Sequence, residues 1–294
     1  MKLADRQKSF MGMDLNGKTI VFTGGTDGMG KVAVTKLAKM GATIMLLGRN
    51  EAKTKAIVSE LNAISKKENT HYIHCDLASQ ESIRKAANTI LDTCSKINYL
   101  INCAGINVAT RQVTKEGYEK NWAINHLGAF LLTNLLLERV KESAPARIIN
   151  LSSAMEKYGH IRFDDLQTVH KWSLLKTYSQ AKLAMNMCTR KMAKELKGSG
   201  VTVNALNPGF IKTNLLRDHS GWTALIGVPY MFFFASKPEV GGDRILRLAL
   251  SKEFEGVTGK FIFEDAERDP NSEALEELLV EKVWEISKQH VGLI

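Results

Sequence analysis

The stretch KTIVFTGGTDGMG, residues 18–30, decides the fold of this chain. Its first part, residues 18–23, is a short β-branched and apolar run that ends in glycines, which is typical of a buried strand. Residues 28–40 then show apolar side chains at helical spacing. A buried strand that passes through a glycine-rich turn into a helix predicts the first half of a βαβ unit.

The same alternation of strand and helix continues along the chain. Further buried strands are predicted at residues 42–47, 71–75, 98–102, 147–151, 201–206 and 260–263, and helices at residues 51–65, 80–95, 117–143, 174–197, 239–250 and 272–290. Strands and helices in this order form a parallel sheet that is covered on both faces, with right-handed crossovers. We therefore expect an α/β fold with a doubly wound parallel sheet of the Rossmann type.

One domain is expected to hold residues 1–294, because the chain contains no linker, repeat or low-complexity segment. It divides into an N-terminal tail (1–16), a dinucleotide-binding core (17–213), a hydrophobic substrate lid (214–259) and a last strand with a closing helix (260–294). The lid contains the apolar stretch LIGVPYMFFFA at residues 225–235. This stretch is interpreted as a lid over a bulky apolar substrate, a contact with a membrane surface, core packing under the cap, or a subunit contact.

Composition limits the classes of function. The hydrophobic content of 44% and charged content of 24% are ordinary for a soluble globular protein. The net charge of +9 is spread along the chain without a basic block, so no nucleic-acid partner is expected. The 4 cysteines show no metal-ligand spacing, which indicates reduced thiols and no metal site. Neither a signal peptide nor an apolar run of ~20 residues is present, so we expect a cytoplasmic protein without a transmembrane segment.

The glycines after the first strand suit a phosphate-binding turn. Gly24 permits a tight turn, while Gly28 and Gly30 let the backbone approach a pyrophosphate at the positive N-terminus of the next helix. An ordinary strand-to-helix turn is the alternative. Because Arg49 follows the second strand, where an NAD site places a carboxylate, NADP(H) is expected and NAD is less favoured. The alternative is that Arg49 is an exposed loop cation.

Tyr178 and Lys182 lie four residues apart in the predicted helix 174–197, so they share one face. A free phenol titrates near ~10, and a neighbouring cation lowers this pKa. The pair could therefore donate and accept protons. Taken alone, the spacing is more typical of ordinary neighbours on a helix.

Taken in order, these motifs resemble those of the short-chain dehydrogenase/reductase family over nearly the whole chain. Asn125, Ser153, Tyr178 and Lys182 fall at the family's four catalytic positions. The sequence NCAG at residues 102–105 is similar to the family's Asn-Asn-Ala-Gly, with Cys103 in place of the second Asn. The resemblance implies cofactor-binding roles for Gly24, Thr26, Asp27, Gly28, Met29, Gly30, Arg49, Asn50, Asp76, Leu77, Asn102, Ala104, Gly105, Tyr178, Lys182, Pro208, Gly209, Ile211 and Thr213.

Three further features resemble the retinol-dehydrogenase-like branch of that family. They are the insert with IRFDDL at residues 161–166, the pair Gly30-Lys31, and the tail VWEIS at residues 283–287. This resemblance implies an NADPH-dependent enzyme that interconverts a hydrophobic aldehyde or ketone and its alcohol. It also implies a homodimer or tetramer built on the predicted helices 117–143 and 174–197.

Each catalytic position has an implied role. Tyr178 would donate the proton, Lys182 would lower the phenol's pKa and hold the nicotinamide ribose, Ser153 would bind the substrate oxygen, and Asn125 would hold a relay water. Backbone bonding for the serine and helix packing for Asn125 are the structural alternatives. Two other functions stay open: a catalytically silent NADP-binding interaction protein, and a reductase of activated C=C bonds.

Overall fold

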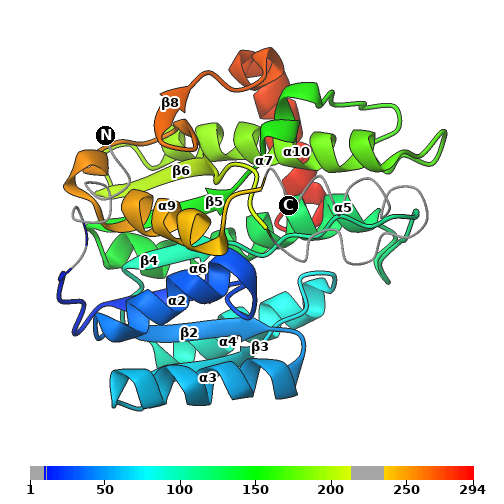
Figure 1. The fold of residues 1–294 in the computed structure, drawn as a ribbon. Coiled ribbons are helices and arrows are strands. Elements are labelled where there is room, and N and C mark those ends of the chain that lie inside the picture. Colours follow the sequence, from blue (N-terminus) through cyan, green and yellow to red (C-terminus); the bar gives the residue numbers. More distant parts are fainter. Residues whose placement is uncertain (1–9, 11, 213–234) are drawn as a thin grey trace.

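A central parallel sheet organises the computed structural model, which describes residues 10, 12–212 and 235–294. In these residues the sheet has eight strands in the order β3-β2-β1-β4-β5-β6-β7-β8 (Figure 1). Pairing is parallel from β3 to β7, and β8 is antiparallel to β7. The strands are β1 (Thr19–Thr23), β2 (Thr43–Gly48), β3 (Thr70–His74), β4 (Tyr99–Asn102), β5 (Ala146–Leu151), β6 (Val201–Asn207), β7 (Phe261–Phe263) and β8 (Ala266–Arg268).

Helices cover both faces of this sheet (Figure 1). One layer contains α2 (Gly28–Lys39), α3 (Glu51–Ser65) and α9 (Pro238–Leu250), and the other contains α4 (Gln80–Thr93), α6 (Ala129–Glu142), α7 (Leu174–Glu195) and α10 (Glu277–His290). Shorter elements are α5 (Lys120–Trp122), η1 (Ala123–Gly128), η2 (Ala154–Tyr158), η4 (Lys252–Phe254) and η5 (Ser272–Leu275). Each layer packs its own apolar cluster against the sheet, as the doubly wound prediction requires.

The switch point of the sheet lies beside β1. Thr23, the last residue of β1, pairs with Leu47 of β2 on one side and Asn102 of β4 on the other. From β1 the strand order runs outward in both directions, so the connections diverge here and leave a crevice beyond the carboxyl ends of the strands. The predicted doubly wound α/β fold is confirmed.

Side-chain caps explain why the helices begin where they do. Asp27, Asn50, Ser79 and Ser173 precede α2, α3, α4 and α7, and each side-chain oxygen accepts a backbone N–H of the first turn. These polar residues satisfy donors that have no partner inside the helix. The predicted helix starts at residues 28, 51, 80 and 174 are therefore confirmed.

Two predicted helices differ from the structure. The helix expected at 117–143 begins at Lys120, after Gly117 with φ of 89°, and contains the π-helical turn η1. The helix expected at 272–290 is divided into η5 and α10, since Glu276 is extended. Strand β8 has exposed side chains throughout, so it carries no apolar pattern from which to predict it.

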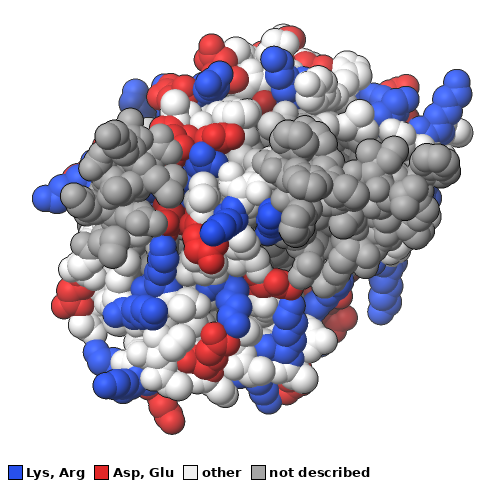
Figure 2. Space-filling view, viewed as in Figure 1, with Lys and Arg blue, Asp and Glu red and all other residues white. Residues whose placement is uncertain are grey.

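Parts of the predicted tail and of the predicted lid belong to the core of the structure. Phe10 and Leu15, in the predicted tail 1–16, are 1% exposed and pack in the core beside α2. From residue 238 onward the segment predicted as a lid forms α9, which belongs to the core layer and packs against α2 and β5. Residues 213–234, including most of the apolar stretch 225–235, lie outside the described residues. On the face shown in Figure 2, Lys and Arg are mixed with Asp and Glu.

Candidate active site

The glycine turn after β1 is shaped by close backbone approaches. Gly24 has φ of 77°, and a Cβ built on it would lie 2.6 Å from the backbone N of Ala104. A Cβ on Gly30 would lie 2.1 Å from the carbonyl oxygen of Gly24. Larger residues would therefore open both the turn and its contact with the loop after β4. The turn leads into the N-terminus of α2, which suits it to a phosphate.

Asp27 closes this N-terminus. Its Oδ1 accepts from the N–H of Gly28 at 2.8 Å, and its Oδ2 pairs with the Nζ of Lys53 at 3.0 Å. Both side chains are about half exposed, so the ion pair itself adds little stability. Thr26 and Met29 are half-buried in the same turn. The pair places a cation from α3 beside the phosphate-binding turn.

The ends of β2 and β3 face the same crevice edge. Arg49 is exposed, and no hydrogen bond or ion pair of its side chain is found within the described part of the chain. Asn50 caps α3 through Lys53 N at 2.9 Å. After β3, Asp76 Oδ1 accepts from Ala78 N at 3.0 Å, and the carbonyl of Leu77 lies against Gly128. Arg49 thus has a guanidinium available to an outside anion.

The loop after β4 is fixed by Asn125 of η1. Asn125 is fully buried, and its amide accepts from Ile106 N and donates to Ile106 O, both at 2.9 Å. A Cβ on Gly105 would lie 3.0 Å from Asn125 Oδ1 and 3.7 Å from Lys182 Nζ. The Asn125 side chain is thus committed to the backbone of this loop, and the loop brings it close to Lys182.

Asn102, the last residue of β4, is buried beneath this loop. Its Nδ2 donates to Thr133 Oγ1 at 2.9 Å and to Asn150 Oδ1 at 2.8 Å, while Asn150 Nδ2 donates to Thr189 at 2.9 Å. This buried polar chain joins β4, β5, α6 and α7 beneath the crevice. The neighbouring backbone N of Ala104 donates to Thr23 Oγ1 at 3.1 Å.

Ser153, Tyr178 and Lys182 meet at the carboxyl end of β5. Ser153 lies beside the Tyr178 phenol, close enough to lower its pKa, and caps η2 by accepting from Met155 N at 3.2 Å. Lys182 Nζ lies 5.7 Å from the centroid of the Tyr178 ring. The structure brings Ser153, and not its neighbour Ser152, to the phenol.

Burial governs the titration of this group. It raises the pKa of Tyr178 to about 12, and the neighbouring Ser153 side chain opposes that rise. It lowers the pKa of Lys182 to about 8, because a buried ammonium loses its hydration. Lys182 Nζ donates to the carbonyl of Leu151 at 2.6 Å. Burial therefore leaves the pKa of the phenol above its usual value in this structure, and the lowering expected from Lys182 stays a prediction.

The segment after β6 forms the last wall of the crevice. Gly209 has φ of 85°, and its N–H donates to Asn207 Oδ1 at 3.2 Å. Ile211 is buried and forms a parallel bridge with Ser236, just before α9. Thr213, expected to bind the cofactor, and the apolar residues 222 and 230–234 lie outside the described residues.

The crevice fits a dinucleotide by an independent observation. Within the described residues, Ser152 Oγ and Asn207 Nδ2 are buried without a hydrogen-bond partner at the carboxyl ends of β5 and β6. Leu151 O is the acceptor that Lys182 reaches there, which leaves further N–H donors on this ammonium. Such groups suit the hydroxyls and amide of a nicotinamide nucleoside. No cluster of three metal-ligating side chains occurs in the parts of the chain that the structure describes.

Sequence reasoning missed two residues near the site. Asn271 donates to backbone carbonyls of the η2 turn next to Ser153, and Arg244 donates to Pro208 O. Both come from the far end of the chain, and neither belongs to a local motif. The only signal for Arg244 in the sequence was an arginine among the apolar positions of the predicted helix 239–250.

Comparisons with known proteins show the family of this chain. The family model described as short chain dehydrogenase matches residues 18–224. Human retinol dehydrogenase 13 is 38% identical over 283 residues, covering 94% of this chain and 85% of the relative, and human retinol dehydrogenase 14 is 35% identical, covering 95% and 88%. An uncharacterised protein of Mycobacterium paratuberculosis has a crystal structure with a TM-score of 0.76, 25% identity and 95% coverage of both chains.

Proposed function

This chain belongs to the short-chain dehydrogenase family, and we propose that it is an NADP(H)-dependent oxidoreductase that interconverts a hydrophobic aldehyde or ketone and its alcohol. The family membership and the relation to retinol dehydrogenases make it an oxidoreductase that uses a nicotinamide dinucleotide. The preference for NADP(H), the hydrophobic substrate and the catalytic roles are our proposal.

The observation that carries the proposal is the meeting of Ser153, Tyr178 and Lys182 beside the crevice. A bound nicotinamide would supply or accept the hydride. Because the pKa of Tyr178 is about 12, the phenol stays protonated at neutral pH and can give its proton to a carbonyl oxygen. Ser153 lies beside the phenol and can donate to the same oxygen, which stabilises the charge that develops there.

Lys182 and Asn125 support this pair. The ammonium of Lys182 has N–H donors beyond the one given to Leu151 O, and these can hold ribose hydroxyls. Asn125 clamps Ile106 with both ends of its amide, so we propose that it fixes the loop beside Lys182. The relay water expected at Asn125 would then bind elsewhere than on this amide.

Two features support the choice of cofactor and substrate. Arg49 presents a guanidinium where the 2′-phosphate of NADP would lie, and no carboxylate follows β2 at residues 48–50. The relatives are named for retinol, a hydrophobic alcohol. A cytoplasmic location remains a prediction; among the residues described, we find no helix with the length and hydropathy needed to cross a membrane.

The test follows NADPH absorbance with a panel of apolar aldehydes and ketones. We expect wild type to turn over some of them and Tyr178→Phe to lose about 10²–10⁴-fold in kcat, the usual contribution of a proton donor. Tyr158→Phe is the matched control, because Tyr158 is 69% exposed and lies in η2. Full activity of Tyr178→Phe would overturn the mechanism, and a product reduced at C=C would replace the carbonyl assignment.

A further inference from the structure

The turn after β6 is held from outside the sheet by Arg244 of α9. Arg244 Nη1 donates to the carbonyl oxygen of Pro208 at 2.7 Å. A Cβ built on Gly209 would lie 2.6 Å from the same Nη1, so the guanidinium packs directly against this backbone. The arginine side chain is 11% exposed. A part-buried, charge-assisted hydrogen bond therefore fixes the carbonyl of Pro208.

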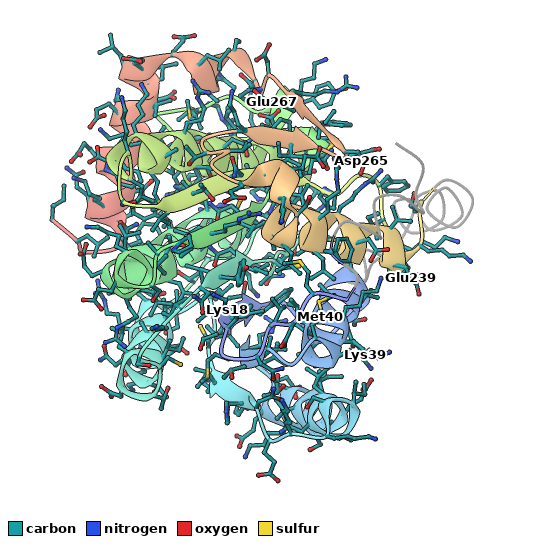
Figure 3. All side chains as sticks on the ribbon, turned by 90° about the vertical axis from the view of Figure 1, so that its left-hand side faces the viewer. Lys18, Lys39, Met40, Glu239, Asp265 and Glu267 are labelled. Carbon is teal, nitrogen blue, oxygen red and sulfur yellow. The ribbon has the colours of Figure 1, made fainter. Side chains whose placement is uncertain are left out.

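The guanidinium is fixed in turn by two carboxylates. Arg244 Nη2 lies 2.9 Å from Glu264 Oε2 and 2.8 Å from Asp265 Oδ2. Glu264 N donates to Asn207 O at 2.8 Å, so this hairpin turn also bonds the end of β6. In Figure 3, Asp265 lies where the turn between β7 and β8 meets α9, whose first turn carries Glu239. Arg244 thus joins α9, the β7–β8 turn and the Pro208 segment.

We propose that Arg244 is a positioning residue for the nicotinamide end of the cofactor site. The inference rests on the proposed function and on the family resemblance, which implies cofactor-binding roles for Pro208, Gly209 and Ile211 in a segment over the nicotinamide. The backbone groups of this segment can bond the nicotinamide carboxamide only if the turn keeps its conformation. A planar guanidinium can bond a carbonyl and two carboxylates at the same time, whereas the single ammonium of lysine suits such a fork poorly.

Arg247, one turn further along α9, provides a matched comparison. It is also buried, and its Nε lies 3.1 Å from Glu253 Oε2 while its Nη1 donates to Asp265 O at 3.1 Å. Its bonds run to Glu253 and Asp265, the second of which it shares with Arg244. Loss of Arg247 therefore removes a similar ionic contact next to the same hairpin, while the Arg244 bond to Pro208 remains.

The experiment measures two dissociation constants for each variant. NADP⁺ probes the whole cofactor site, and adenosine 2′,5′-bisphosphate probes its adenosine half alone. We expect Arg244→Met to weaken NADP⁺ binding about tenfold, the scale of one charge-assisted hydrogen bond, and to change the bisphosphate constant less than about twofold. Arg247→Met should lower both affinities equally or leave both unchanged. Calorimetry and thermal melting of the same samples separate binding from stability.

Arg244→Lys keeps the experiment decisive if the methionine variant does not fold. It retains the charge and one donor, so NADP⁺ affinity should fall by a smaller factor than in Arg244→Met, again with the bisphosphate unaffected. An equal loss for both ligands, or an equal NADP⁺ loss in the Arg244 and Arg247 variants, overturns the inference and leaves the proposed function standing. A wild type that binds neither ligand overturns the proposed function and this inference with it.

Discussion

Glu156 and Asn271, 115 residues apart in sequence, bond each other in both directions. The backbone N of Asn271 donates to the two carboxylate oxygens of Glu156 at 3.3 and 3.0 Å, and Asn271 Nδ2 donates back to Glu156 O at 3.2 Å. The same amide donates to Gly159 O at 2.9 Å. Glu156 lies in η2, the turn that Ser153 caps. The bonds from Asn271 therefore attach the C-terminal segment to the turn that follows Ser153.

We predict that Glu156→Gln lowers both stability and activity. Glu156 is 2% exposed, and its replacement would set an amide NH₂ against the Asn271 N–H. A buried donor left without an acceptor costs about 1–3 kcal/mol. Displacement of the turn should lower kcat with little change in the NADPH dissociation constant. Urea unfolding and steady-state kinetics measure the two effects.

Lys157→Gln is the control for this change, because Lys157 is the exposed neighbour in the same turn. Its stability should stay within about 0.5 kcal/mol of wild type. If Glu156→Gln behaves like Lys157→Gln in both measurements, the bond between Glu156 and Asn271 does not position Ser153.

NADPH binding should weaken as pH rises through about 8. Burial lowers the pKa of Lys182 to about 8, well below the usual value of 10.5, so the ammonium is charged below pH 8 and neutral above it. A neutral amine holds ribose hydroxyls less firmly, and the 2′-phosphate keeps a constant charge over this range. Fluorescence titration of NADPH from pH 7 to 10 measures the change.

Lys182→Arg separates this titration from other alkaline effects. A guanidinium stays charged beyond pH 12, so the variant should bind NADPH more weakly at pH 7 but with a flat pH profile up to pH 10. A wild-type profile that is flat to pH 10 would show that the bound cofactor or another group keeps Lys182 protonated.

Removal of Arg49 should narrow the preference for NADPH over NADH. A charge-assisted hydrogen bond to phosphate contributes about 1.5–3 kcal/mol, so Arg49→Ala should reduce the ratio of the two affinities about tenfold or more. Affinity for NADH should change little. Lys39→Ala is the control, because Lys39 is exposed at the C-terminal end of α2, away from the phosphate-binding turn (Figure 3). Equal affinities of the wild type for NADPH and NADH would contradict the assignment.

The parts that sequence could predict depend on local patterns. Buried parallel strands are continuous apolar runs, and glycine turns and capping residues mark their ends. The position of the crevice could therefore be predicted from the spacing of these signals. Tyr178 and Lys182 share a helix face for the same reason. The directions of their polar atoms do not follow from spacing: Lys182 bonds Leu151 O of β5, a contact set by the packing of α7 on the sheet.

Long-range contacts account for the rest. Asn271 and Glu156 meet because α10 folds back over α7, and Arg244 reaches Pro208 because α9 packs beside α2. Neither pair forms a pattern within one element. The π-helical turn at Asn125 could not be predicted either, because the apolar periodicity of this segment is that of one continuous helix. These contacts depend on the completed fold and therefore could not be predicted from local patterns in the sequence.

Helix α10 packs on α7, one of the two helices on which the family resemblance implied subunit contacts. Residues 177–189 of α7 are all buried within this one chain. Ser287 of α10 bonds His126 at 2.7 Å, and the rings of Trp284 and Phe130 lie 5.0 Å apart at 80°. A homo-oligomer built on the outer side of α7 would require α10 to leave, so we expect wild type not to associate through that side.

Trp284→Ala tests this arrangement. Trp284 is 8% exposed, and removal of a buried tryptophan costs about 3–5 kcal/mol, so the free energy of unfolding should fall by roughly that amount. Loosening α10 should also expose apolar surface of α7 and raise self-association, measured by sedimentation at several concentrations. Leu278→Ala is the control on the same helix: Leu278 is 87% exposed, and its loss should change stability by less than about 0.5 kcal/mol. If wild type already forms an oligomer that Trp284→Ala dissociates, α10 is itself part of the subunit interface and does not merely cover α7.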